Sequence, residues 1–420
     1  MRQYARLLRD NPDYARLWLA SVISNLGDWF DTIALSALVV AYSGDNKGLA
    51  VSLLLMARFI PPMLISPFAG VLIDRLDRKK LLIWSNYLRA GIVLLLLFGT
   101  RGPEWLWLIY VLTMAQFSLS AVFLPGESAL IPSLVKRDDL VRANTLGSVT
   151  WSVMLAVGAA LGGLASAVLG TSFALTFDAV TFIVAGWLIG QITTYKFKAV
   201  TTQSHAQRRD TSFREGLRFL RRNPGTAATL LIKFGGSLGN IDTLMTIFAT
   251  QLFVLGSGGQ LSLGIMYSAF GVGAVLGPVM LNRFNDGSVR AMRRLVTIGF
   301  IWMVFGWLTL GVAESLVIVC VALVLRAMGG SANWTYSSVM IQKLAPDAYL
   351  GRVFSVDMAL YYLATVTSTL VHGSLVDALG SANLRVIAFG TMVVSLLPLA
   401  LWTLATRVME RRAQAAVVQT

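Results

Sequence analysis

The sequence has 420 residues, of which 56% are hydrophobic and 13% charged, and its mean hydropathy is +0.68. No soluble domain of this length needs so much apolar surface, so the composition indicates a polytopic membrane protein. The net charge of +14 lies in short clusters between apolar segments, which is typical of topology signals and argues against a nucleic-acid-binding groove.

Cysteine and histidine are too scarce for several kinds of site. Cys320 is the one cysteine, which excludes an intramolecular disulfide and a multi-cysteine metal site, and two histidines exclude a histidine metal cluster. The sequence also lacks a Walker lysine and a nucleophile elbow, so it gives no support for ATP hydrolysis or covalent catalysis. We therefore expect no enzyme, no metal and no cofactor.

The apolar segments predict twelve membrane spans. Their approximate ranges are 17–42, 48–73, 81–99, 104–126, 143–168, 172–191, 227–254, 262–283, 294–312, 315–341, 352–376 and 384–406. Most of the 35 lysines and arginines fall in the termini and even-numbered loops, whereas the odd-numbered loops contain only Lys47, Arg101 and Arg385. This asymmetry predicts that both termini are cytoplasmic, and the basic N-terminus has no cleavable signal sequence.

The halves of the sequence repeat each other. Asn11-Pro12 recurs as Asn223-Pro224, and Leu26-Gly27-Asp28 recurs as Leu238-Gly239-Asn240, at a common offset of 212. We expect six-helix bundles at 1–191 and 226–420, joined by a cytoplasmic linker over 192–225. Within this linker SFREGLRFLRR predicts an amphipathic helix on the inner leaflet, with Phe213, Leu217 and Leu220 near one face.

The loop after the second span carries the most specific motif. GVLIDRLDRKK, residues 70–80, resembles the G-x-L-x-D-R-x-x-R-K signature of major facilitator superfamily transporters at Gly70, Leu72, Asp74, Arg75, Arg78 and Lys79. It departs from the pattern at Asp77, where glycine is usual. A carboxylate at the helix end can pair with a neighbouring helix and latch one conformation, which makes Gly70, Asp74, Arg75, Arg78 and Lys79 a candidate latch. The alternative is an ordinary basic cytoplasmic hairpin.

Further motifs narrow the resemblance. ARFIPP, FLPGESALIPSLVKRDDLVRAN and IQKLAPDAYLGRVFS resemble loops of the enterobactin-exporter and macrolide-efflux branch of the superfamily. The resemblance implies an all-α membrane protein with twelve transmembrane helices in two pseudo-symmetric six-helix bundles. It also implies a transporter in the plasma or inner membrane that exports hydrophobic or amphipathic small molecules, such as drugs or siderophores.

Ionisable residues inside spans are the candidates for coupling, because each costs about 2.5 to 3.5 kcal/mol at a helix centre. Asp28 and Asp31 share one face of the first span, and two neighbouring carboxylates in a partly dry site favour binding of a proton. The alternative for Asp28 is a structural ion pair with Arg58. Asp242 is near the symmetry counterpart of Asp31. Asn240, Gln116 and aromatic residues that include Trp334, Tyr361 and Tyr362 are candidates to line the cavity.

For the other ionisable residues we predict roles in gating, in the latch or in local structure. Arg326 and Asp357 form a possible inner gate, to which we add Glu127, an acidic residue where the branch leads us to expect a basic one. We expect Lys233 to snorkel to solvent, Arg89 to join the Asp74 latch or an adjacent polar cluster, and Asp178 to have a structural hydrogen bond. His372 is the weakest candidate for a proton carrier.

Gly158, Gly162 and Gly163 in GAALGG resemble the G-P-x-x-G-G element of antiporters, with Ala159 in place of proline. Generic close packing of helices is the alternative explanation.

The predicted function is export driven by proton exchange, performed by a monomer whose partners are a small-molecule substrate, protons and the lipid bilayer. A lipid or lysophospholipid flippase is one alternative, and a non-transporting scaffold or receptor is another.

Overall fold

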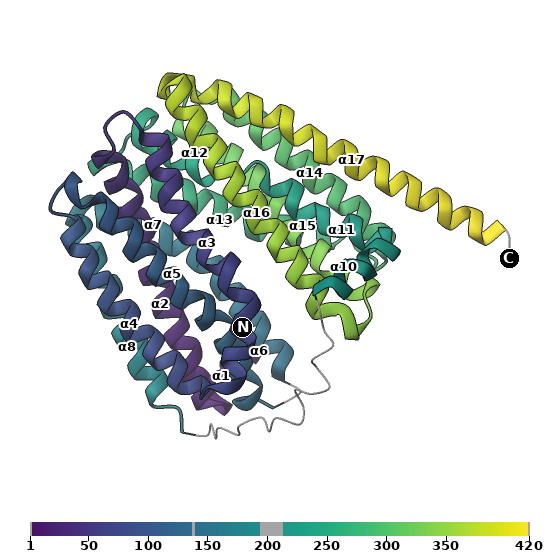
Figure 1. Cartoon of the computed structure of the whole chain (residues 1–420), viewed down its shortest axis with the longest axis horizontal. Helices are drawn as coiled ribbons and strands as arrows, with labels where there is room; N and C mark the ends of the chain where they lie inside the picture. Colours follow the sequence, from purple (N-terminus) through teal and green to yellow (C-terminus); the bar gives the residue numbers. More distant parts are fainter. Residues whose placement is uncertain (1, 137–138, 194–212, 419–420) are drawn as a thin grey trace. The chain divides into compact units, whose positions relative to one another are not determined.

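The computed structural model describes residues 2–136, 139–193 and 213–418, and every regular element in these ranges is a helix (Figure 1). The chain forms two compact units. Unit 1 comprises Met1–Ser204 and Thr243–Ser268, and unit 2 comprises His205–Asp242 and Ala269–Thr420.

Unit 1 contains the helices that hold most of the buried charge. They are α1 (Arg2–Asp10), α2 (Pro12–Tyr42), α3 (Lys47–Arg75), α4 (Arg78–Gly99), α5 (Leu106–Leu130), α6 (Leu140–Val153), α7 (Ala159–Leu169) and α8 (Thr171–Gly190), with short elements η1 (Pro103–Trp105), η2 (Ile131–Ser133) and η4 (Met154–Gly158). Most of α12 (Asp242–Ile247), η5 (Phe248–Leu252), η6 (Ser257–Gly259) and the first residues of α13 (Gln260–Asn282) also pack here.

Unit 2 contains α10 (Phe213–Arg222), α11 (Pro224–Ser237), the remainder of α13, α14 (Val289–Gly311), α15 (Leu316–Leu344), α16 (Asp347–Leu379), η7 (Ser381–Asn383) and α17 (Leu384–Val418). Helices at corresponding positions in the two halves of the sequence pack together in corresponding pairs. The contact of α4 with α8 in unit 1 corresponds to that of α14 with α17 in unit 2, and the contact of α3 with α5 corresponds to that of α13 with α15. The pairing confirms the internal repeat.

The repeated Asn-Pro dipeptides have one conformation in both halves. Asn11 has φ −129° and ψ 76°, Asn223 has φ −122° and ψ 76°, and the proline that follows each begins a long helix. The missing N–H of proline costs nothing in the first turn of a helix. Each asparagine amide donates to the carbonyl four residues earlier, at 3.0 Å for Asn11 and 2.9 Å for Asn223. Both halves therefore open with a short helix, a corner and a long helix.

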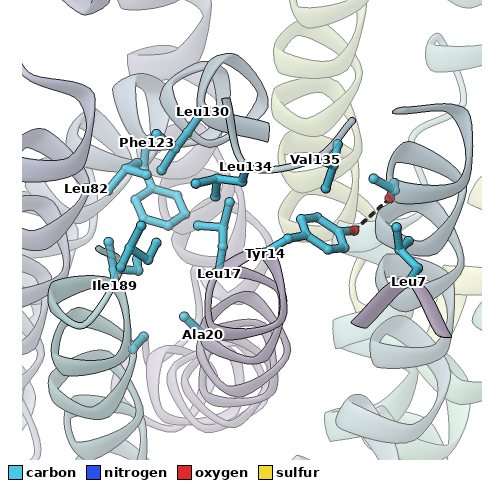
Figure 2. Close-up of a cluster of buried hydrophobic side chains, with 13 residues drawn as sticks. Leu7, Tyr14, Leu17, Ala20, Leu82, Phe123, Leu130, Leu134, Val135 and Ile189 are labelled. Carbon is cyan, nitrogen blue, oxygen red and sulfur yellow. Dashed lines mark hydrogen bonds between the residues drawn. The ribbon is translucent and has the colours of Figure 1, made fainter. Parts of the chain in front are cut away.

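An apolar core closes one end of unit 1 (Figure 2). Leu17 of α2, Leu82 of α4, Phe123 of α5 and Ile189 of α8 are at most 4% exposed and pack on one another. At the same end the Tyr14 hydroxyl donates to the Ala143 carbonyl at 2.9 Å, joining α2 to α6. This core fixes the spacing of the helices that carry the charged residues described below.

Ten segments of the described chain are long and apolar enough to span a membrane. The two remaining predicted spans are also helical. The first is α2, which carries polar residues such as Asp28 and Asp31 near its middle, and the second is divided among α11, α12 and η5. The all-helical, twelve-span architecture is therefore confirmed.

The helix predicted over 227–254 is broken at 238–241. Arg326 of α15 donates to the carbonyls of Gly236 and Gly239, which the break leaves without helical partners. Ser368 of α16 donates to the Leu238 carbonyl at 2.7 Å and accepts from the Asn240 N–H at 2.9 Å. The freed backbone groups are thus satisfied by side chains of unit 2, which an apolar environment requires.

The linker helix forms as α10, and the last of its three predicted apolar residues packs against protein. In α10, Leu220 is 6% exposed and packs with Ile341 and Val353 of unit 2. The ring of Phe219 stacks on Tyr349 of α16 at 4.7 Å. Its apolar residues here are covered by protein because α16 offers an apolar surface of its own. The side chains of Phe213 and Leu217 lie outside the described residues.

Candidate functional site

Two ion pairs lie side by side in unit 1. Arg89 of α4 donates to Asp28 of α2 with 2.8 Å between Nη2 and Oδ1, and Arg58 of α3 lies 3.6 Å from Asp31 between Nη2 and Oδ2. The side chain of Asp31 is 1% exposed and that of Asp28 31% exposed. Asp28 and Asp31 face neighbouring helices because they are three residues apart on α2.

Neutral side chains fix the position of these charges. The Arg58 guanidinium donates to the Thr32 hydroxyl at 2.7 Å, and that hydroxyl donates to the Asp28 carbonyl. Gln116 of α5 donates to Asp31 at 3.2 Å. Arg58 and Gln116 therefore hold one carboxylate from two helices, and Asp31 Oδ1 still lacks a hydrogen-bond partner among the residues that the structure describes.

Asp178 of α8 is a third carboxyl group in the same region. It is fully buried, and among the described residues it forms no ion pair, although Arg89, Asp28 and Asp31 act on it electrostatically. Thr181 donates to Asp178 Oδ1 at 3.3 Å, and in the described part of the chain Oδ2 has no hydrogen-bond partner. A Cβ built at Gly27 would overlap the Asp178 carboxyl group and the Thr181 hydroxyl. Glycine therefore permits α2 to approach Asp178 closely.

Aromatic rings surround the two cations. The Arg89 guanidinium lies 4.0 Å from the centroid of Phe182 and 5.8 Å from that of Phe123, and the Arg58 guanidinium lies 5.1 Å from that of Phe117. These rings stabilise the cations without neutralising them. We name Asp28, Asp31, Asp178, Arg58 and Arg89 the charge cluster. Its three carboxyl groups outnumber its two guanidinium groups.

The pairing within the charge cluster bears on the expectations for Asp28 and Arg89. Asp28 pairs with Arg89 and not with Arg58, because the three-residue step along α2 turns Asp31 toward α3 and Asp28 toward α4. Of the two places expected for Arg89, the Asp74 latch and an adjacent polar cluster, it occupies the second, as the partner of Asp28. The side chain of Asp74 lies outside the described residues. A signal for the pairing of Asp28 with Arg89 exists in the sequence, since a carboxylate in span 1 and a cation in span 3 both need buried partners.

A separate ion pair lies in unit 2. Lys233 Nζ of α11 lies 2.5 Å from Asp357 Oδ2 of α16, with side chains 2% and 0% exposed. The expectation that Lys233 snorkels to solvent is therefore wrong, because a buried carboxylate lies within its reach. The predicted ion pair of Arg326 with Asp357 is also wrong, since Asp357 pairs with Lys233 and Arg326 binds the carbonyls at the break in the helix.

Asn240 and Asp242 form a local turn at that break. Asn240 Oδ1 accepts from the Asp242 N–H at 3.1 Å, and Asn240 Nδ2 donates to the Asp242 carboxylate at 3.1 Å. Asp242 also interacts electrostatically with Arg326. His372 lies between two hydroxyl groups, with Nε2 2.9 Å from Thr391 and Nδ1 3.3 Å from Ser368. Because Ser368 also binds the backbone at the break, His372 is connected to the break through Ser368.

The three antiporter-like glycines lie at close helix contacts in unit 1. A Cβ at Gly158 would lie 2.9 Å from the Trp29 ring, and one at Gly162 would lie 3.0 Å from the Trp29 carbonyl. A Cβ at Gly163 would lie 2.8 Å from the Gln260 carbonyl and from the Cα of Gly264. Small residues are therefore required where α7 meets α2 and the start of α13.

The latch residues are described in part. Gly70, Asp74 and Arg75 are helical in α3, but their side chains lie outside the described residues. Arg78 donates to the Ala129 carbonyl at 2.9 Å and Lys79 to the Ile192 carbonyl at 2.7 Å. Asp77, the departure from the signature, accepts from the N–H groups of Lys79 and Lys80 and caps α4.

Glu127, grouped with the inner gate from the sequence, lies in unit 1 and accepts a hydrogen bond from Ser21 of α2. Arg326 and Asp357 lie in unit 2.

Known proteins resemble the chain over most of its length. It is 26% identical to the putative bacilysin exporter BacE of Bacillus subtilis over 378 residues, which cover 88% of this chain and 90% of that protein. It is 25% identical to macrolide efflux protein A of Streptococcus pyogenes over 400 residues, which cover 90% and 92%.

Solved structures share the fold. A bacterial homologue of the iron transporter ferroportin superposes with a TM-score of 0.70 at 13% identity, covering 94% of this chain and 98% of that one. A D-xylose-proton symporter also superposes with a TM-score of 0.70, at 12% identity, covering 92% and 97%. The family model for transmembrane secretion effectors matches residues 6–419. The chain therefore belongs to the transmembrane secretion effector family of the major facilitator superfamily, whose members are multi-pass membrane transporters and not enzymes.

Proposed function

We propose that this exporter is driven by proton exchange and that the charge cluster of unit 1 is the group that binds the proton. The excess of one carboxyl group over the guanidinium groups supports the proposal. A fully ionised cluster would bury a net negative charge, which costs several kcal/mol in a medium of low dielectric constant. One proton shared among Asp28, Asp31 and Asp178 neutralises the cluster.

The proton exchanges with the aqueous phase through Asp28, because the side chain of Asp28 is more exposed than that of Asp31. When the cavity opens to the acidic side, a carboxyl group takes up the proton. When it opens to the cytoplasm, the proton leaves and the two ion pairs tighten. This sequence requires alternating access, which we assign to movement between the bundles at 1–191 and 226–420.

The substrate is a hydrophobic or amphipathic small molecule. The names of the relatives support this class, since BacE is described as a putative bacilysin exporter and the streptococcal protein as a macrolide efflux protein. The protein acts in the cell membrane as a monomer with both termini cytoplasmic. Arg78 and Lys79, with Asp74, serve as the latch of one conformation.

The experiment is transport in reconstituted vesicles under an imposed pH gradient. Asp28→Asn removes the ionisable group and keeps its shape, so we expect proton-driven transport to fall at least about a hundredfold, while the protein stays folded. Asp45→Asn makes the same change in an exposed loop and should transport like the wild type. Undiminished proton-driven transport by Asp28→Asn would remove the cluster from the mechanism.

A further inference from the structure

The ammonium group of Lys233 occupies a site of the kind that binds organic cations. It lies against the Asp357 carboxylate, 4.4 Å from the ring centroid of Trp334 and 5.8 Å from that of Phe354. A carboxylate combined with aromatic faces is the arrangement that recognises ligand ammonium groups. The ligand here is the end of a flexible side chain of the protein itself.

The site is larger than the lysine requires. Tyr361 packs edge-on against Trp334 at 5.0 Å, and Tyr362 packs against Tyr361 at 5.1 Å, so the aromatic surface continues along α16. Trp334 is 42% exposed although the ion pair beside it is buried. A ligand can therefore contact the aromatic surface before it reaches the carboxylate.

The carboxylate also has unused capacity. Asp357 Oδ1 is buried without a hydrogen-bond partner among the described residues, and Oδ2 alone binds Lys233. A buried acceptor left unsatisfied is costly, so Oδ1 can accept a hydrogen bond from a further N–H donor that enters the site. Arg326 of α15 does not compete for Asp357, because its guanidinium is bound to the carbonyls of Gly236 and Gly239.

Exchange of one cation for another at this site keeps the buried carboxylate paired. A buried ion pair gains little net free energy, because desolvation of both charges offsets their attraction. An incoming ammonium group preserves the pair while Lys233 withdraws along its flexible stem. The same exchange with a neutral ligand would leave Asp357 buried and unpaired.

We propose that Asp357, Trp334 and Phe354 form a substrate site for amphipathic amines and that Lys233 is a tethered competitor that occupies the site when no substrate is bound. The proposal rests on the proposed export function and specifies its substrate class. It assigns substrate recognition to unit 2 and proton binding to unit 1.

Three probes with one carbon skeleton test the charge preference: 4-phenylbutylamine, 4-phenylbutanol and 4-phenylbutanoate. Binding is measured by equilibrium dialysis on the purified full chain in lipid nanodiscs at neutral pH, without a proton gradient. The wild type should bind the amine and neither of the other probes. Lys233→Met removes the competitor, so it should bind the amine about tenfold more tightly than the wild type.

Two further variants keep the test decisive if Lys233→Met folds poorly. Lys233→Gln removes the charge but retains a donor for Asp357, and it should also bind the amine more tightly. The double variant Lys233→Met with Asp357→Asn removes both charges, so it should fold and lose amine binding.

Equal binding of the amine to the wild type and to both lysine variants would overturn the proposal, as would a preference for 4-phenylbutanoate. Asp28→Asn should bind the amine like the wild type. If Asp28→Asn loses proton-driven transport but still binds the amine, proton coupling and amine recognition depend on different residues. Either proposal can then fail without the other.

Discussion

Asp178 distinguishes the observed charge cluster from the one expected from the sequence. The sequence identified Asp28, Asp31 and Arg58 by their depth in spans, but it gave Asp178 only a structural hydrogen bond. The structure places this carboxyl group against Gly27, next to the two paired carboxylates. Sequence reasoning could not find this contact, because the contact depends on which faces α2 and α8 turn toward each other.

Asp178→Asn should uncouple transport from protons. The substitution leaves two carboxylates opposite two guanidinium groups, so the cluster is neutral without a bound proton. We expect exchange of labelled for unlabelled substrate to continue and uptake driven by a pH gradient to fall to background. Both are measured in the same vesicles, with Asp45→Asn as the control. Gradient-driven uptake at the wild-type rate would show that the third carboxyl group is only structural.

Among the elements, α2 and its repeat in unit 2 have diverged in form. Leu26-Gly27-Asp28 lies inside an unbroken helix, whereas Leu238-Gly239-Asn240 lies at a break between α11 and α12. The sequence predicted both elements, over 17–42 and 227–254, and the structure begins them earlier, at Pro12 and Pro224. The sequence could not predict the break, which depends on Arg326 and Ser368 from distant helices.

Gly27→Ala should destabilise the contact of α2 with α8. The new methyl group would overlap Asp178 and Thr181, so the helices must separate, at a cost of about 1 to 3 kcal/mol. Gly91→Ala is the matched control, because a Cβ at this position in α4 meets nothing within 4 Å and should stabilise by roughly 0.5 to 1 kcal/mol. Thermal unfolding in detergent compares the two. Equal melting temperatures would contradict the close approach.

Ser368→Ala should loosen the break between α11 and α12. It leaves the Leu238 carbonyl and the Asn240 N–H without this partner, which costs about 1 to 3 kcal/mol. Hydrogen exchange at Asn240 should accelerate by at least about tenfold. Ser355→Ala on the same helix is the control, because that exposed hydroxyl bonds only its own helix, to the Gly351 carbonyl. Slow exchange at Asn240 in Ser368→Ala would show that Arg326 alone maintains the break.

At the scale of the whole molecule, the two halves keep a common plan but place different charges in it. Gln116 of α5 and Arg326 of α15 are 210 residues apart, and each reaches the first helix of its own half: Gln116 binds Asp31, and Arg326 binds the carbonyls at the break. The lengths of the apolar segments were sufficient to predict twelve helices, and the residues matched at a constant offset were sufficient to predict the repeat. They could not predict the partners of buried charges, since each partner is chosen by packing between helices far apart in the sequence.

The same asymmetry of charge predicts which loops face the cytoplasm, and the single cysteine makes this testable. Cys320→Ala gives a background without cysteine, into which Asp45→Cys or Asp286→Cys is introduced. Asp45 is exposed in the loop between α2 and α3, and Asp286 is exposed in the loop between α13 and α14. Basic residues flank Asp286 at Arg283 and Arg290, which favours the cytoplasm. In intact cells, a membrane-impermeant maleimide should therefore label Asp45→Cys at once. It should label Asp286→Cys only after the membrane is permeabilised. The reverse pattern would invert the topology and, with it, the direction in which the charge cluster releases its proton.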